Sequence, residues 1–400
     1  MHPTMINSST AEVSAHSAPS EIPVRSHAKS KPARHANVKK PLLLLGFFLG
    51  LTASAMAQSA NVSVFATGLN NPRGLKFGPD GNLYVAEGGE AGVLSTVGSA
   101  EQVPAPVGPY TGGFTARISK ITKNGTRITV VDGLPSSQTS ADQGNLISGV
   151  GDVAFVGRKL YAILAGAGDS HGLANTDNAV LEVQKDGDVT VVADLSIYQE
   201  NHPVKNPFLP DFEPDGTWYS MISVCGSLFA VEPNHGELDE INPANGHIRR
   251  IADISATQGH IVPTALTYDG DFYVGNLGTF PIVDGSSKIL KITPSGHVTT
   301  FATGFTTVVG LVFDDQHRLY VLENTTGNPF PTPNTGKVVR INRSGQVDEI
   351  ATGLFLPTAM TFGPDGNLYV SNVGFGPPPV GLGQVVKITL PERDRPHDCH

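Results

Sequence analysis

Short runs of alternating apolar and polar residues, each bounded by turn residues, recur along the chain. Residues 74–77 and 82–86 form two such β-prone runs, and the turn Gly78-Pro79-Asp80-Gly81 joins them. Proline and aspartate favour a tight turn, and glycine accepts a positive φ there. Two further alternating runs follow at 116–122 and 126–131, joined by the Lys123-Asn124-Gly125 turn. Four antiparallel strands joined in this way are typical of one β-propeller blade.

This pattern is an internal repeat. Residues 66–85 and 351–370 align without a gap and agree at 14 of 20 positions. Weaker copies lie between them, each marked by a strand with an aromatic residue at its centre. These aromatic residues are Tyr84, Tyr161, Phe229, Tyr273, Tyr320 and Tyr369. Similarity at a period of tens of residues indicates a repeat architecture, and six copies predict an all-β, six-bladed propeller.

The two ends of the repeat predict how the ring closes. The last copy stops after its third strand, at 388–390, whereas a lone fourth strand at 61–66 precedes the first copy. We therefore expect the amino-terminal strand to complete the last blade. Such closure removes strand edges that would otherwise promote aggregation.

The amino terminus resembles an export signal. A basic pair, Lys39-Lys40, precedes an apolar stretch at 41–51 and the small-residue site Ala55-Met56-Ala57. The stretch is too short to span a membrane. We predict cleavage after Ala57 and a secreted or periplasmic protein; an uncleaved anchor is the alternative. The domains predicted are a tail and signal peptide at 1–57, the propeller at 58–392 and a disordered tail at 393–400.

Net charge limits the classes of binding partner, and the cysteine content limits the number of disulfides. The formal net charge is −9, and removal of residues 1–57 makes it more negative. An acidic protein is a poor partner for nucleic acids or anionic membranes. We therefore expect no nucleic-acid partner, no membrane association after cleavage, and a monomer. With only Cys225 and Cys399, the chain is no disulfide scaffold, and whether these two pair stays open.

The repeat motifs resemble those of the six-bladed propellers of the NHL type, and most closely the secreted ScyD/ScyE family associated with scytonemin gene clusters. The resemblance covers roughly residues 60–392 and is carried by 66–69, 72–75 and the two Gly-Pro-Asp-Gly-Asn-Leu-Tyr-Val segments. It implies an exported propeller without an assigned catalytic residue. Residues 229–235 of the third blade depart from the pattern, which puts any family site there in doubt.

Long connections predict where a ligand binds. The loops between the second and third strands, about 88–115, 165–178, 277–287, 324–336 and 373–383, lie on one face with the connections between blades. Function usually resides on such loops, although insertions are also tolerated there. We expect a small molecule or protein to bind this face. The predicted residues are Arg73, Glu87, Tyr219, Glu232, Thr264, Asn276, Glu323, Thr358 and Asn372.

Five of these side chains suggest a cation site. The second strands end in Glu87, Leu164, Glu232, Asn276, Glu323 and Asn372. Carboxylate and amide oxygens are Ca²⁺ ligands, and the regucalcin/gluconolactonase propellers use a central cation to polarise a lactone. The polar five would then be metal ligands, and the protein a Ca²⁺-dependent lactonase or hydrolase. Alternatively, each side chain bonds backbone nearby.

Histidines give a weaker signal. His171, His202, His235 and His260 fall in loop-face segments, where we expect them to be mainly solvent-exposed. His260 lies closest to a first strand, and a general base there is conceivable. His260 and Arg73 are the two residues that favour a third hypothesis, a quinone-dependent sugar dehydrogenase. No nucleophile elbow, zincin motif or phosphate loop occurs. The principal hypothesis is a ligand-binding or scaffolding module, and the Ca²⁺-dependent lactonase is its rival.

Overall fold

A computed structural model describes residues 57–375 and 381–395, and its strands form six antiparallel sheets. The first three sheets run from the channel outwards as β2 (Pro72–Phe77), β3 (Leu83–Glu87), β4 (Thr111–Ile121) and β5 (Arg127–Gln138) with the short β6 (Ile147–Ser148); β7 (Val150–Val156), β8 (Lys159–Leu164), β9 (Ala179–Val183) and β10 (Val189–Asp194); and β11 (Ser220–Val224), β12 (Ser227–Glu232), β13 (Glu237–Ile241) and β14 (Ile248–Asp253).

The remaining sheets have the same order. They are β15 (Pro263–Asp269), β16 (Asp271–Asn276), β17 (Ser287–Ile292) and β18 (Val298–Phe305); β19 (Val308–Phe313), β20 (Leu319–Glu323), β21 (Gly336–Ile341) and β22 (Val347–Leu354); and β23 (Ala359–Phe362), β24 (Leu368–Asn372), β25 (Gly383–Ile388) and β1 (Val62–Leu69). The helical pieces are α1 (Leu195–Asn201), α2 (Ser255–Gln258) and the 3₁₀ turns η1 (Ala141–Gln143), η2 (Asp169–His171), η3 (Leu209–Asp211) and η4 (Glu392–Asp394).

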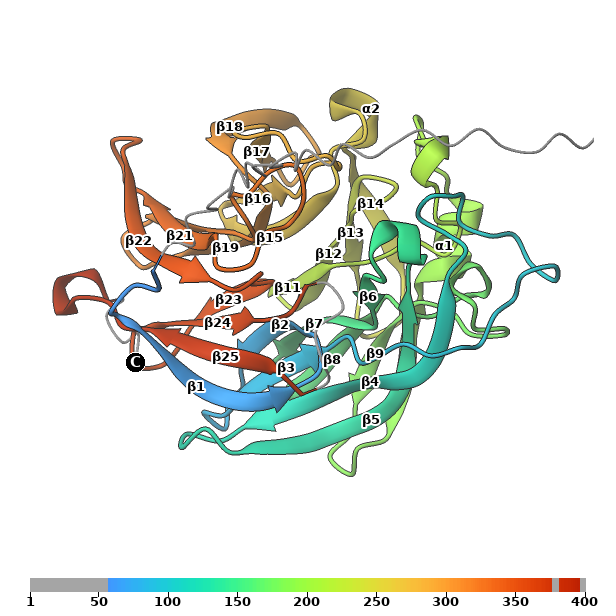
Figure 1. The fold of residues 1–400 in the computed structure, drawn as a ribbon, viewed down its shortest axis with the longest axis horizontal. Helices are drawn as coiled ribbons and strands as arrows, with labels where there is room; N and C mark the ends of the chain where they lie inside the picture. Colours follow the sequence, from blue (N-terminus) through green and yellow to red (C-terminus); the bar gives the residue numbers. More distant parts are fainter. Residues whose placement is uncertain (1–56, 376–380, 396–400) are drawn as a thin grey trace, which may run out of the picture. The chain divides into compact units, whose positions relative to one another are not determined.

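The six sheets form a closed ring. The innermost strand of each sheet contacts that of the next, in the cyclic order β2, β7, β11, β15, β19 and β23. The predicted closure is confirmed: β1 pairs antiparallel with β25, from Val62 opposite Ile388 to Leu69 opposite Gly383. Figure 1 shows β1, in blue, beside the red strand β25. The protein is therefore an all-β, six-bladed propeller whose last blade takes its outer strand from the amino-terminal side.

Local chemistry explains the tight turns. The Gly78 N–H donates to the Asn82 carbonyl at 2.8 Å, Asp80 Oδ1 accepts from the Asn82 N–H at 3.1 Å, and Gly81 has a φ of +72°. That φ favours glycine. The sixth blade repeats the geometry at Gly363 and Asn367, again at 2.8 Å. The two copies of Gly-Pro-Asp-Gly therefore form the same turn.

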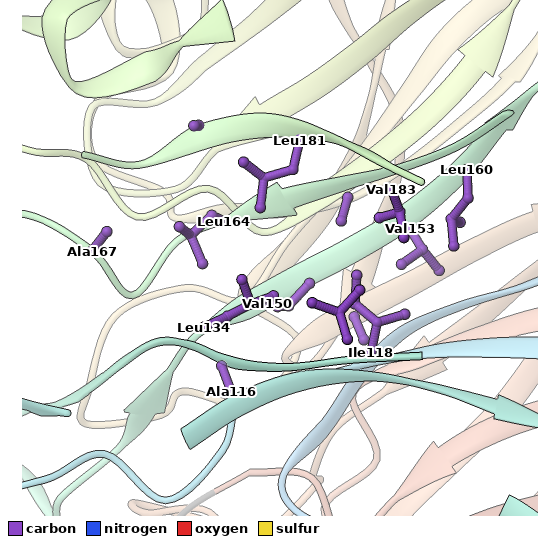
Figure 2. Close-up of a cluster of buried hydrophobic side chains, with 14 residues drawn as sticks. Ala116, Ile118, Leu134, Val150, Val153, Leu160, Leu164, Ala167, Leu181 and Val183 are labelled. Carbon is purple, nitrogen blue, oxygen red and sulfur yellow. The ribbon is translucent and has the colours of Figure 1, made fainter. Parts of the chain in front are cut away.

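The core lies between neighbouring blades. Figure 2 shows the cluster between the first and second blades, which includes Ile118 on β4, Val153 on β7 and Leu160 on β8. The repeating aromatic residue also reaches across a blade boundary: the Tyr84 ring lies edge-on to Phe155 at 5.2 Å, and Tyr320 meets Phe362 in the same way at 5.3 Å. This packing gives a physical reason why an aromatic residue recurs at this strand position, since neighbouring blades must cover each other.

The predictions for the two ends of the chain fall partly outside the described residues. The apolar stretch at 41–51 lies outside the described residues, and so does Cys399; Cys225 is free and exposed. At the other end, Asp394 lies in the segment predicted to be disordered, yet it forms ion pairs of 2.9 Å with Arg318 and 2.8 Å with Arg340. The placed chain thus continues to residue 395. No helix in the described ranges has the length and apolar character required to cross a membrane.

Candidate functional site

A cavity of about 330 Å³ lies on the predicted loop face, at the mouth of the central channel. Its wall combines connections between blades with loops between second and third strands. The lining residues that matter for its chemistry are Arg73, Tyr110, Glu213, Tyr219, His260 and Phe375. This volume is within the usual range for small-molecule sites. The cavity lies on the face at which we expect a small molecule or protein to bind.

Arg73 brings a positive charge to the floor of this cavity. It lies on the innermost strand β2, is only 6 % exposed and donates from Nη2 to the Ile147 carbonyl. Its guanidinium carbon lies 5.9 Å from the centre of the Tyr219 ring and 6.0 Å from that of Phe375. Within the described ranges, none of the ion pairs includes Arg73. A buried charge without an opposite charge is costly, so this cation attracts an anion.

Three other predicted residues of this face hold the ring together. The Tyr219 hydroxyl donates to the Thr358 carbonyl at 3.1 Å and thereby joins the third blade to the sixth. The Thr358 hydroxyl donates to the Pro72 carbonyl at 2.6 Å, and that of Thr264 donates to the Val308 carbonyl at 2.6 Å. Each bond satisfies a backbone group near the channel. Tyr219 and Thr264 also line the cavity, whereas the Thr358 hydroxyl is committed to a neighbouring blade.

The five predicted metal ligands are engaged locally. Glu87 accepts from the Asn70 N–H at 2.6 Å, Glu232 from the Thr217 N–H at 2.7 Å and Glu323 from the Thr306 N–H at 2.7 Å. The two amides behave alike: Asn276 Oδ1 accepts from the Lys288 N–H at 2.8 Å, and Asn372 Oδ1 from the Phe355 N–H at 2.9 Å. All five are therefore used to hold backbone of their own blades or of the connections that lead into them.

The remaining oxygens are also occupied. Arg117 pairs with Glu87 at 2.8 Å, and Lys337 pairs with Glu323 at 3.0 Å. Burial raises the pKa of Glu323, and the Thr306 N–H and Lys337 oppose this rise. Among residues 57–375 and 381–395, no group of three or more His, Cys, Asp or Glu side chains is suitable for a metal. These contacts agree with the alternative, local backbone bonding, while the cation ring stays an untested prediction, and we derive no metal-dependent step from these residues. Leu164 is buried.

The histidine expectation needs correction. His171 and His235 are buried rather than exposed, at 0 % and 3 %. The His260 side chain is only 6 % exposed; its Nε2 lies 3.0 Å from Asp211 Oδ2, and its ring stacks on Phe208 at 4.6 Å between centres. His202, by contrast, is exposed and stacks on Tyr198. His260 does line the cavity, which keeps it a candidate general base held by Asp211.

A buried polar network supports one wall of the cavity. Glu213 accepts from the Tyr110 hydroxyl at 2.8 Å and lies 3.1 Å from His171 Nε2. Burial alone would lower the pKa of His171, but the hydrogen bond and negative charge of Glu213 outweigh it and raise that pKa above its ordinary value. Burial and Glu213 together also raise the pKa of Tyr110. Glu213 is therefore paired with His171 and Tyr110, and it forms no ion pair with Arg73 among the described residues.

Sequence reasoning missed several lining residues. Phe208, Asp211 and Glu213 lie on the long connection between β10 and β11, and Tyr110 lies just before β4. The only signal for the connection is the spacing of 68 residues between the aromatic markers Tyr161 and Phe229, which is wider than in later blades. That spacing reveals an insertion, but not that it folds back over the channel mouth.

The fold and site place the protein in the class of six-bladed propellers with a cavity at the channel mouth. No family model matches the chain, and no curated protein matches it. Solved structures share the fold. A Bacteroides thetaiotaomicron protein of unknown function is 12% identical, with a TM-score of 0.53, over 82% of this chain and 76% of that one.

Two further similar structures are those of proteins described as enzymes. A putative oxidoreductase (glucose dehydrogenase) from Thermus thermophilus has a TM-score of 0.52 and 16% identity, over 82% of this chain and 99% of that one. A gluconolactonase from Xanthomonas campestris has a TM-score of 0.49 and 11% identity, over 82% of this chain and 89% of that one. At such identities the likeness concerns the fold alone.

Proposed function

We propose that this protein is an exported binding module that holds a small organic anion at the channel mouth, with the anionic group against Arg73. The observation that carries the proposal is the buried guanidinium, which faces a cavity and has no carboxylate partner among the described residues. A bound carboxylate supplies the missing negative charge and accepts charge-assisted hydrogen bonds, which are stronger than neutral ones.

The rest of the cavity favours an apolar body on that anion. Phe208, Phe280 and Phe375 line it together with Trp218. Few precisely placed polar groups among apolar and aromatic walls are typical of small-molecule sites. The acidic side chains on the wall, Glu213 and Asp211, are already paired with His171 and His260. A ligand with one acidic group and an apolar remainder matches this distribution.

Location and family membership are part of the same proposal. The basic and apolar segments before Ala57 support export to the periplasm or the exterior. The repeated Gly-Pro-Asp-Gly-Asn-Leu-Tyr-Val segments support relation to the ScyD/ScyE type of propeller. A binding role agrees with both, since neither requires a catalytic residue, and the proposal includes a monomer.

Trp218 provides the measurement. It is the only tryptophan of the chain, is 1 % exposed and lines the cavity. Titration with 4-phenylbutyrate should change its fluorescence with a saturable dose response, and the neutral 4-phenylbutanol should bind at least about tenfold more weakly, because charge-assisted bonds contribute roughly 1.5–3 kcal/mol.

The variant Arg73→Met should abolish this preference for the carboxylate. Arg158→Met is the matched control, because it removes the same charge from an exposed turn between β7 and β8, where no lining residue lies. Equal affinity of wild type and Arg73→Met for phenylbutyrate contradicts the proposal, provided that both variants keep the thermal midpoint of a folded protein.

A further inference from the structure

A second and larger hollow adjoins the cavity. Its volume is about 610 Å³, and it shares the lining residues Gln143, Leu146, Phe280 and Phe375 with the cavity that contains Arg73. The two hollows therefore meet along these four side chains. The connection before β7, the loop after β16 and the loop after β24 all contribute to the shared border.

This second hollow, which we call the trough, is mostly apolar. Beyond the shared border it is lined by Phe330, Pro331, Pro333, Phe355, Leu356 and Leu382, and the only charged side chain along it in the described ranges is Asp142. Phe330 is 65 % exposed and Leu382 is 53 % exposed. Large apolar side chains gain free energy when they leave water, and contiguous exposed apolar surface is typical of a binding site.

Charge separates the two hollows clearly. The cation lies at one end, on the floor of the cavity, and no Lys or Arg lines the trough within the described residues. A ligand that satisfies both must be negative at one end and apolar along the rest. We infer that the ligand class is an amphipathic carboxylate with a long hydrocarbon chain, its carboxylate at Arg73 and its chain in the trough. This inference rests on the proposed function and adds the chain.

Continuity with Arg73 favours this occupant over a second copy of the protein or a partner peptide. A protein surface that covered only Phe330 and Leu382 would leave the buried cation unmatched. A single fatty acid covers both features at once. Its recognition would depend on chain length, whereas recognition of a short carboxylate by Arg73 would not.

The test is a series of straight-chain fatty acids from hexanoate to dodecanoate, each kept below its micellar concentration and followed by Trp218 fluorescence. Each added methylene that enters the trough should tighten binding roughly two- to fourfold. Dodecanol should bind more weakly than dodecanoate, because it lacks the charge that Arg73 requires.

The variants Phe330→Ser and Leu382→Ser separate this inference from the proposed function. Both residues are exposed, so folding should be retained. Each should weaken dodecanoate binding by about fivefold or more and leave hexanoate and 4-phenylbutyrate unchanged. Phe301→Ser is the matched control, since Phe301 is 43 % exposed on the outer strand β18 and lies outside both hollows.

Three results contradict specific parts. Arg73-dependent binding of phenylbutyrate without any chain-length dependence overturns the trough inference and leaves the proposed function standing. A dimer in light scattering that Phe330→Ser dissociates also overturns it, in favour of a second copy. Absence of binding by every carboxylate overturns the proposed function itself.

Discussion

The two near-identical repeats, residues 66–85 and 351–370, show which positions make a blade and which make a site. Shared positions have the same contacts: Tyr84 donates to Asp80 at 3.1 Å, and Tyr369 donates to Asp365 at 3.1 Å. The positions that differ diverge in role. Arg73 faces the cavity, whereas its counterpart Thr358 bonds the next blade's backbone. One substitution thus converts a structural position into a candidate binding group.

The equivalence extends beyond the identical residues. Glu87 and Asn372 differ chemically, yet each accepts a hydrogen bond from a backbone N–H 17 positions earlier. A carboxylate and an amide oxygen can both perform this task. The comparison therefore teaches that a functional residue is recognised by what it leaves unpaired, rather than by its residue type.

The largest expected effect comes from removing strand β1, which leads into the first copy and pairs with β25 after the second copy. A chain that begins at Gly68 lacks most of β1, so β25 loses its partner strand and Phe65 no longer packs on Tyr369. Its thermal midpoint should lie at least about 10 °C below that of a chain beginning at Gln58. The last blade loses the hydrogen bonds of β1, and the exposed edge of β25 promotes aggregation. Differential scanning calorimetry measures this, and equal midpoints contradict the closure argument.

The next effect concerns Gly74 and its counterpart Ala359. A Cβ on Gly74 would lie 1.7 Å from Asp152 Oδ1 and 2.6 Å from Asp152 Cα. Gly74→Ala should therefore cost about 3 kcal/mol of unfolding free energy, whereas the reverse change Ala359→Gly should cost about 0.5–1 kcal/mol. Urea titration of both variants tests the asymmetry, and similar costs would show that the two positions have the same surroundings.

Substitutions of Arg73 and Thr358 should have opposite consequences: loss of Thr358 should mainly lower stability, and loss of Arg73 should mainly abolish binding. Thr358→Val removes the donor to the Pro72 carbonyl and should cost about 1–3 kcal/mol. Arg73→Met should cost less, because it also removes an uncompensated buried charge. Chemical denaturation gives the stabilities and phenylbutyrate titration gives the binding. The comparison fails if Thr358→Val abolishes binding while Arg73→Met merely destabilises the fold.

The carboxyl group of Asp152, which occupies the space beside Gly74, should make stability depend on pH. Burial raises the pKa of Asp152 from 3.8 to about 7, although N–H groups of Met221 and Val153 oppose the rise. The folded state then prefers the protonated form, so the free energy of unfolding should fall as pH rises from about 4 to 7 and change little above that. Asp152→Asn should make this fall less steep, and Asp239, whose pKa burial also raises to about 7, should account for part of the remainder.

Shared aspartates provide the internal control for the pH experiment. Burial alone would raise the pKa of Asp80 and of Asp365. Hydrogen bonds outweigh this effect and lower the pKa of both carboxyl groups, and the largest of these bonds at Asp365 comes from Lys387. Their stabilisation should be present above the ordinary aspartate range and lost as pH falls below it. An unchanged slope between pH 4 and 7 in Asp152→Asn would show that another group titrates there.

The smallest expected effect is that of calcium. Because Glu87, Glu232 and Glu323 are already bonded within their blades, added Ca²⁺ should shift the thermal midpoint by less than about 1 °C. Glu323→Gln should instead cost roughly 1–3 kcal/mol with or without Ca²⁺. A calcium-dependent rise in the wild type that Glu323→Gln removes would restore the cation-ring hypothesis.

The fold could be predicted because its signals are periodic. Tyr84 and Tyr320 mark their blades since each ring packs on an aromatic residue of the following blade. Turn residues such as Gly81 are equally informative, because few residues adopt their φ. The closing strand followed from counting strands at the two ends, and its pairing with β25 confirms that reasoning.

The site could be predicted only in part. The sequence places Arg73 and His260 near the channel mouth, but pairing decides their roles, and pairing depends on the path of an aperiodic connection. Asp211 and Glu213 arrive from such a connection and pair with His260 and His171 rather than with Arg73. The cation ring depends on the same kind of information: residue type gives oxygen ligands, whereas the structure shows that backbone N–H groups of the incoming loops bond them.

The pairing of β1 with β25 also dictates an order of assembly during synthesis. Asn61 bonds the Thr389 carbonyl, 328 positions along the chain. Five sheets consist of contiguous segments and can form as the chain emerges, but the sixth must wait for its third strand. Contacts of such sequence separation form slowly. Until then the nascent protein carries an open seam at which other chains can add a strand. Efficient production should therefore depend on how long the seam is shielded.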